Sequence, residues 1–274
     1  MRDGTDASDG AAAQATPAVI RVWDVGVRLF HWLLVASVAG AFATGFIGEP
    51  WLLDPHLMLG SLIAALVLWR LIWGCTGSTY ARFASFLCRP SATLAHVRDL
   101  ARGHGEHHLG HNPLGGWMIV ALLVTLAAIL VTGVLALGGT LKQGPLAALT
   151  SYAQGRTAKE IHEALAFGLL GLIALHVTGV VAESIRTRES LVRAMLTGRK
   201  RAPACAITAC EARPRPVLAG MLSITFFLAA GAGILWLPRL PARGVPAAPL
   251  DAAYAKECGA CHSVHHPSVA PSAT

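Results

Sequence analysis

The sequence predicts an all-α membrane protein: a four-helix transmembrane bundle, a fifth transmembrane helix and a short C-terminal tail. The 274 residues are 54% hydrophobic and only 14% charged, whereas a soluble domain carries about a quarter charged residues. Five apolar stretches are also long enough to cross a hydrocarbon core of about 30 Å, which takes roughly 20 helical residues. This composition excludes a disordered chain, which needs low hydrophobicity and high charge density.

The five predicted spans cover approximately residues 29–47, 57–73, 117–137, 161–181 and 217–237. Their length and lack of alternation argue against core helices of a soluble protein and against β-structure. Lipid cannot satisfy exposed backbone groups, so we expect helices. Small residues recur in the spans, at Gly40, Gly45, Gly60, Gly133, Gly168, Gly171 and Gly179. They either allow close helix packing or leave room for a flat cofactor, and glycine alone does not decide between these interpretations.

The basic residues lie mainly on one side of the predicted spans. Sixteen of the 22 Lys and Arg residues fall in the N-terminus, in residues 70–116 and in residues 183–216. Cytoplasmic segments carry this excess, so we expect a multi-pass membrane protein with a cytoplasmic N-terminus and a C-terminus on the opposite side of the membrane. The net charge of +7 is then a topology signal, and no nucleic-acid partner is expected.

Four histidines lie within these spans or at their ends, where ionisable residues are functional candidates by default. His31 and His56 begin the first and second spans, and His162 and His176 share the fourth. At about 100° per residue, their spacing places His162 and His176 on one helix face, about 21 Å apart along the axis.

The expected topology pairs these histidines by depth. His31 and His176 fall near the cytoplasmic surface, and His56 and His162 fall near the outer surface. Two facing neutral imidazoles suit a six-coordinate haem iron, and bundle cores often hold such cofactors. The pattern predicts two haems b, with ligand pairs His31/His176 and His56/His162. The alternatives are hydrogen-bonded interfacial histidines, a proton relay and a haem-free metal transporter, although no mid-membrane acid accompanies the histidines.

Several motifs also carry a family resemblance. They are Val22-Trp23-Asp24 to Phe30-His31-Trp32, Trp69-Arg70-Leu71-Ile72-Trp73-Gly74, Tyr80-Ala81-Arg82-Phe83, His111-Asn112-Pro113-Leu114-Gly115-Gly116-Trp117, and His162-Glu163 through His176. Together they resemble bacterial cytochrome b561-type proteins, which include the cytochrome b subunits of nickel–iron hydrogenases. The resemblance covers roughly residues 20–190. It implies two b haems held by the same four histidines, and electron exchange with quinone or quinol in the membrane.

The tail contains Cys258-Gly259-Ala260-Cys261-His262, and CxxCH is the attachment motif for c-type haem. Cys258 and Cys261 would bind one covalent haem c, with His262 as an axial ligand, and the expected periplasmic location suits this attachment. The tail also resembles the start of bacterial di-haem cytochrome c domains. It offers no methionine as sixth ligand, which leaves an external ligand, a five-coordinate iron or a C-terminally truncated chain. A redox dithiol, a zinc half-site and a disulfide are the alternatives.

Other polar groups have two interpretations each. Residues 104–111 are rich in histidine and either bind a metal or form a solvated cytoplasmic loop, which we expect. Arg28 and Arg70 either pair with haem propionates or anchor the helix ends at the interface. Four further cysteines, Cys75, Cys88, Cys205 and Cys210, are expected to be reduced on the cytoplasmic side.

The sequence thus predicts five segments: a disordered N-terminus (1–18), a di-haem cytochrome b bundle (19–190), a basic cytoplasmic linker (191–216), a fifth transmembrane helix (217–237) and a periplasmic tail with a c-type haem (238–274). We expect electron transfer across the bilayer, between the quinone pool and the tail haem with its periplasmic c-type cytochrome or other redox partner. The main alternative is a hydrogenase or dehydrogenase subunit that passes electrons to quinone. A superoxide/quinone oxidoreductase is a further alternative.

Overall fold

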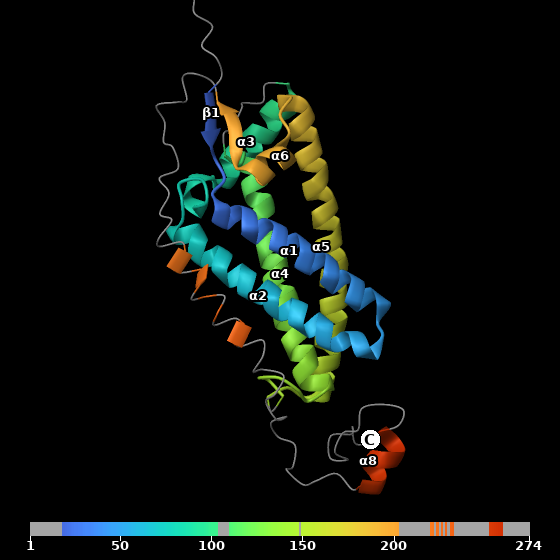
Figure 1. The fold of residues 1–274 in the computed structure, drawn as a ribbon. Helices are drawn as coiled ribbons and strands as arrows, with labels where there is room; N and C mark the ends of the chain where they lie inside the picture. The colour runs from blue at the N-terminus through green and yellow to red at the C-terminus, as the bar shows by residue number, and fades with distance from the viewer. Residues whose placement is uncertain are drawn as a thin grey trace, which may run out of the picture.

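The computed structural model describes residues 18–103, 110–147 and 149–202, individual residues between 220 and 232, and residues 252–259. The elements are β1 (Ala18–Arg21), α1 (Val25–Ile47), η1 (Pro50–Leu52), α2 (Leu53–Thr76), η2 (Phe83–Ser85), α3 (Pro90–Ala101), α4 (Pro113–Thr140), α5 (Tyr152–Thr187), α6 (Leu191–Thr197), β2 (Arg199–Ala202) and α8 (Ala252–Gly259). The long helices α1, α2, α4 and α5 form an elongated bundle, with β1, β2, α3 and α6 at one end (Figure 1).

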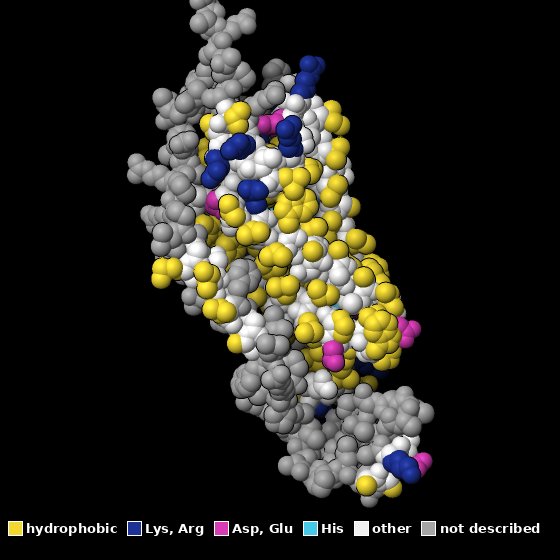
Figure 2. All heavy atoms as spheres, in the orientation of Figure 1, with side chains coloured by type: hydrophobic (Ala, Val, Ile, Leu, Met, Phe, Trp, Pro, Cys, Tyr) yellow, Lys and Arg dark blue, Asp and Glu magenta, His cyan; other side chains and the backbone are white. Residues whose placement is uncertain are grey.

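Four helices in the described part of the chain are long and apolar enough to cross a membrane. They are Val25–Ile47, Pro50–Thr76, Pro113–Thr140 and Tyr152–Thr187, and each contains one of the first four predicted spans. Apolar side chains cover much of the visible flank of the bundle, while Lys and Arg gather near β2 and α6 (Figure 2). Exposed Leu29, Val124 and Phe167 are typical of a lipid-facing surface. The prediction of a multi-pass helical bundle is confirmed.

Polar side chains fix where the long helices begin. The Asp24 carboxylate accepts the Val27 N–H at 2.8 Å and caps α1. Asn112 caps α4 by accepting the Gly115 N–H at 2.7 Å. The α5 helix begins with a reciprocal capping box between Ser151 and Gln154. Each cap satisfies backbone donors that a helix N-terminus leaves free.

The described part of the segment expected as a basic linker forms α6 and β2. The β2 strand pairs antiparallel with β1, Ala18 opposite Ala202 and Arg21 opposite Arg199. Just before β2, the Gly198 carbonyl accepts the Val22 and Trp23 N–H groups at 2.9 and 3.1 Å. Gly198 has φ +79, and a Cβ there would lie 2.5 Å from the Trp23 carbonyl oxygen. The chain therefore returns from α5 and closes against the segment that leads into α1.

The two helix pairs of the bundle pack differently. In α4 and α5, Gly139 and Gly155 meet so closely that a Cβ on Gly139 would lie 2.4 Å from the Gly155 Cα. In α1 and α2, the contact is aromatic: the Phe30 and Trp69 rings stack with centroids 6.0 Å apart. Both contacts bring paired helices together. Glycines allow close backbone approach in one pair, and large aromatic rings fill the interface in the other.

The fifth predicted span and the tail lie largely outside the described residues. The described positions between 220 and 232 are helical, and Trp69 Nε1 donates a hydrogen bond to Ser223 Oγ at 3.1 Å. Phe226 packs against the core of the bundle. These contacts place this part of the segment beside α2.

Candidate functional site

The imidazoles of His56 and His162 face one another across the bundle. His56 lies in the first turn of α2 and His162 lies on α5, and their ring centroids are 6.2 Å apart with an interplanar angle of 70°. An imidazole nitrogen binds a metal at about 2.0–2.1 Å and its centroid lies roughly 1.1 Å further, so two axial imidazoles on one ion have centroids roughly 6.3 Å apart. The observed separation fits two axial ligands of one iron.

Backbone carbonyls fix the tautomers of this pair. His56 Nδ1 lies 3.1 Å from the Ala41 carbonyl oxygen, and His162 Nδ1 lies 2.9 Å from the Ile129 carbonyl oxygen. A carbonyl oxygen only accepts, so each Nδ1 must donate the proton and each Nε2 keeps its lone pair. This arrangement of a carbonyl behind a histidine is typical of metal-ligating imidazoles.

A Thr-Gly dipeptide follows each of these carbonyls by one helical turn, at residues 44–45 and 132–133. Thr44 Oγ1 lies 3.0 Å from His56 Nδ1, and Thr132 Oγ1 lies 3.5 Å from His162 Nδ1. The following glycines admit the rings: a Cβ on Gly45 would lie 3.3 Å from His56 Cε1, and a Cβ on Gly133 would lie 3.2 Å from His162 Cε1. Sequence reasoning missed the threonines, although the dipeptide precedes both histidine-bearing helices.

The other glycines of the spans separate into two groups. Gly40 packs against Leu59, with a Cβ-to-Cδ1 distance of 3.0 Å. In contrast, Gly60, Gly168, Gly171 and Gly179 would meet nothing within 4 Å of an added Cβ. Gly60 follows His56 by one turn of α2, on the same helix face. Close packing and open space therefore both occur, and the open space at Gly60 adjoins the histidine pair.

His31 lies within range of the charge of His176, its expected partner in the second pair. His31 is in the second turn of α1, where its ring meets Trp32 edge-on at a centroid distance of 5.1 Å. The His31 Nδ1 atom is buried and has no hydrogen-bond partner in the described part of the chain. A buried polar atom without a partner indicates that a further group completes this site.

His111 is a neighbour of this second pair that sequence reasoning did not place beside it. Its ring lies 4.5 Å from the Trp23 ring and 4.9 Å from the Phe86 ring, centroid to centroid. Burial lowers the pKa of His111 to about 3, and the charges of Arg70, Lys200, His176 and His31 contribute in the same direction. The expectation of a solvated loop is wrong for His111, because the aromatic rings that enclose it come from distant segments. Residues 104–109 lie outside the described residues.

The Trp69–Gly74 motif holds the ends of α1 and α2 together. Trp73 Nε1 donates to Asp24 Oδ2 at 3.1 Å, and the Ser78 hydroxyl donates to the same oxygen. Phe83 fills the space beside Gly74, where a Cβ would lie 2.1 Å from Phe83 Cε2. The Arg70 guanidinium lies over the Phe83 ring, 4.6 Å from its centroid.

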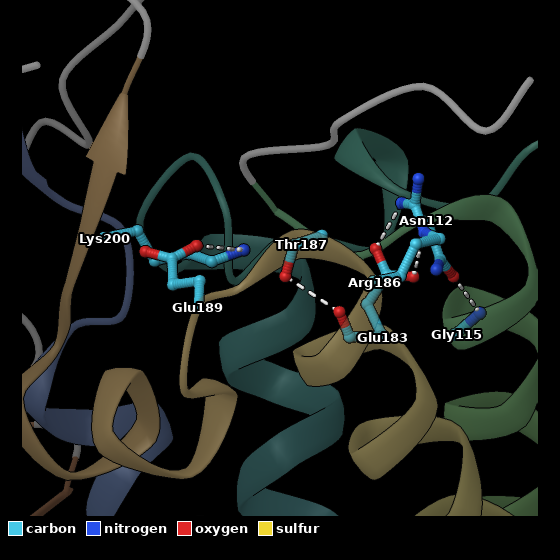
Figure 3. Close-up of polar contacts among 7 residues, drawn as sticks. All are labelled: Asn112, Gly115, Glu183, Arg186, Thr187, Glu189 and Lys200. Carbon is cyan, nitrogen blue, oxygen red and sulfur yellow. Dashed lines mark hydrogen bonds and ion pairs between the residues drawn. The ribbon is translucent and has the colours of Figure 1, made fainter.

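A polar cluster closes the same end of the bundle (Figure 3). Glu183 accepts from Arg186 Nη2 and Nε at 2.7 and 3.0 Å, and its carbonyl accepts the Thr187 hydroxyl at 2.8 Å. Lys200 Nζ lies 4.0 Å from Glu189 Oε2. Burial lowers the pKa of Lys200, and the negative charges of Glu189 and Glu183 oppose that shift. These contacts anchor β2 against the end of α5.

Comparison with known proteins identifies the bundle. Residues 22–198 match the family described as prokaryotic cytochrome b561. The chain belongs to this family. It is therefore a membrane b-type cytochrome that takes part in electron transfer, and the family implies b-type haem as its cofactor.

Named relatives agree with this assignment. Two are described as probable Ni/Fe-hydrogenase B-type cytochrome subunits, from Azotobacter chroococcum mcd 1 and Cupriavidus necator. They are 24% and 21% identical to the chain over 230 and 231 residues, covering 72% of it in both cases and 95% and 94% of the relatives. A third, from Azotobacter vinelandii, has the same description and is 24% identical over 230 residues. No solved structure matches the chain significantly.

Most of the predicted c-type haem motif lies outside the described residues and outside the family match. Cys258 lies in α8 (Ala252–Gly259), and Cys261 and His262 lie outside the described residues. The family match ends at residue 198, before this motif. Cys75 and Cys88 are free, exposed thiols.

Proposed function

We propose that the chain carries electrons across the bacterial inner membrane through two b haems, each held by two histidines. His56 and His162 would bind the outer haem through their Nε2 atoms, and His31 and His176 would bind the inner one. The observation that carries this proposal is the His56–His162 pair, with centroids 6.2 Å apart and both Nδ1 atoms next to carbonyls. Bound there, haem b supplies a one-electron carrier whose potential depends on ligands and burial.

The protein's own groups would do three things at each site. The Ala41 and Ile129 carbonyls hold the imidazole tautomer, which preorganises the ligands before the cofactor enters. Gly45 and Gly133 leave space for the rings. The apolar helix faces exclude water, which raises the effect of every nearby charge on the electron carrier.

The proposed partners are quinone or quinol in the membrane and a c-type haem on the periplasmic side. The CxxCH motif at Cys258, Cys261 and His262 supports a covalent haem c on the tail, in a segment (238–274) tethered by a fifth span (217–237). The excess of Lys and Arg supports a cytoplasmic N-terminus. Residues 19–190 would then form the electron-carrying unit.

Two spectroscopic measurements test this function. Reduced-minus-oxidised spectra with pyridine haemochrome analysis of the full chain should give two b haems and one c haem. Cys258→Ser with Cys261→Ser should remove the c signal and keep both b haems. Addition of quinol to the oxidised protein should reduce the b haems first and then the c haem. A protein without b haem, or one whose haems quinol does not reduce, would contradict the proposal.

A second candidate follows from the named relatives. They are described as hydrogenase cytochrome subunits, and an equivalent role here would deliver electrons from a partner enzyme to quinone. Purification of the full chain from its native membrane distinguishes the two. A co-purifying hydrogenase or dehydrogenase that reduces the b haems supports the subunit role. Rapid turnover of superoxide by the isolated chain would instead favour a superoxide/quinone oxidoreductase.

A further inference from the structure

Arg70 is a buried cation without a polar partner in the described part of the chain. Its side chain, on α2, is only 3% exposed, and its Nη1 atom is buried without a hydrogen bond. Among the described residues no carboxylate lies within 4.0 Å of its guanidinium. Phe83 supplies one face of the surroundings, 4.6 Å from ring centroid to guanidinium carbon. An unpaired buried cation is strongly unfavourable, so the folded protein needs an anion at this place.

Asp24 is the nearest candidate within the chain, but its oxygens are already engaged. The charge of Asp24 interacts favourably with that of Arg70. However, Asp24 Oδ1 accepts the Val27 N–H at 2.8 Å, and Oδ2 accepts from Trp73 at 3.1 Å and from Ser78. Asp24 therefore caps α1 and ties it to the end of α2, and it leaves the Arg70 Nη1 atom unsatisfied.

The position of Arg70 relates it to the inner histidine pair. Its neighbour Trp69 stacks on Phe30, the residue before His31, so Arg70 lies at the level of the first turns of α1. His111 interacts electrostatically with Arg70, His31 and His176. The His111 Nδ1 atom is also buried without a hydrogen-bond partner in the described part of the chain. Two unsatisfied polar groups thus lie beside the same pair of histidines.

We propose that Arg70 binds a propionate carboxylate of the haem held by His31 and His176, with His111 beside it in the same site. This inference rests on the proposed function. A carboxylate matches the two-pronged donor geometry of a guanidinium. A phosphate from lipid or solvent offers similar acceptor oxygens, so the test must separate the cofactor's own carboxylate from another anion. Arg28 is less suited to the role, because its Nη2 donates to the Leu196 carbonyl and joins α1 to α6.

The test uses the full chain in detergent, produced without haem, with His162→Ala so that only the inner pair is complete. It is titrated with iron protoporphyrin IX and with its dimethyl ester, in which both carboxylates are blocked, and binding is followed in the Soret band. With Arg70 present, we expect the ester to bind about tenfold more weakly or worse. Arg70→Gln should weaken the free acid by a similar factor and abolish the difference between acid and ester, because the two changes remove one interaction.

The matched controls are Arg82→Gln and Arg70→Lys. Arg82 is exposed and its replacement should leave the preference for the free acid unchanged, whereas Arg70→Lys should restore part of it. A chain with Arg70→Gln that still prefers the acid tenfold would overturn the inference. So would equal binding of acid and ester when Arg70 is present, since another anion then occupies the guanidinium. If the chain with all four histidines takes up no haem, the proposed function itself fails.

A second readout does not depend on the His162→Ala background. In the otherwise unchanged chain, redox titration of Arg70→Gln should lower the midpoint potential of one b haem and leave the other in place, because a cation beside a haem favours its reduced state. Unchanged midpoints for both haems would also overturn the inference.

Discussion

His56 and His162 hold their rings 6.2 Å apart, each with its Nδ1 atom against a carbonyl of the preceding long helix. The two halves of the bundle use the same device: a helix with Thr-Gly at 44–45 or 132–133, followed by a helix with the histidine. The geometry makes Nε2 of both rings available before any cofactor is bound.

Replacing Gly133 with Val should displace the His162 ring. A Cβ at this position would already lie 3.2 Å from His162 Cε1, and the extra methyl groups of Val require a larger shift. We expect the b-haem content to fall from two per chain toward one, as measured by pyridine haemochrome. The control is Gly168→Val, since a Cβ on Gly168 meets nothing within 4 Å; it should retain both haems. Equal haem content in the two variants would contradict the packing role of Gly133.

Replacing Thr44 with Val should affect haem binding more than replacing Thr132. Thr44 Oγ1 is 3.0 Å from His56 Nδ1, whereas Thr132 Oγ1 is 3.5 Å from His162 Nδ1. Loss of the shorter contact should weaken binding of the haem proposed for His56 and His162 by about 1 kcal/mol, or roughly fivefold in affinity. Titration of each variant with haem, followed in the Soret band, measures the affinity. A larger loss of affinity for the Thr132 variant would contradict the prediction that the shorter contact contributes more to haem binding.

Replacing Asp24 with Ala should destabilise the folded bundle. The change removes the α1 cap, for about 1 kcal/mol, and leaves Trp73 Nε1 without its acceptor, for about 1–3 kcal/mol more. Thermal unfolding in detergent should show a lower midpoint than for Asp54→Ala, which alters an exposed residue in the first turn of α2. Similar midpoints would mean that the Asp24 contacts contribute little.

The imidazole of His111, packed between aromatic rings, should make the fold sensitive to acid. Its pKa is lowered to about 3 by burial and by nearby cations, compared with about 6.5 in the unfolded chain. The unfolded state therefore binds more protons between about pH 6.5 and pH 3, and stability decreases as pH falls through that window. His111→Gln should flatten this decrease relative to the unchanged chain, measured as unfolding midpoints from pH 7 to pH 4. Parallel pH profiles would show that His111 is not the responsible group.

The sequence allowed the main helices and the proximity of His56 and His162 to be anticipated. Each of the first four apolar stretches lies inside a long helix, because length and apolar composition are local properties that lipid selects directly. The spacing of His162 and His176 follows from helix geometry. Together with the charge asymmetry of the flanks, it led us to expect His56 beside His162, and their rings lie 6.2 Å apart.

Other features depend on contacts between distant segments. The β1–β2 pairing joins residues 18–21 to a basic segment at 199–202, and neither strand has a pattern that identifies its partner. His111 is half-buried because the Trp23 and Phe86 rings pack against it, which its polar local sequence does not reveal. The support of His56 by Ala41 uses a backbone carbonyl, and any residue type supplies one.

The haem content of His162→Ala, compared with the unchanged chain, tests the central claim most directly. Pyridine haemochrome analysis should give two b haems per chain in the unchanged protein and one in His162→Ala. His96→Ala, a control at a buried histidine on α3, should keep both. Two b haems in His162→Ala, or fewer than two in the unchanged chain, would contradict ligation by paired histidines.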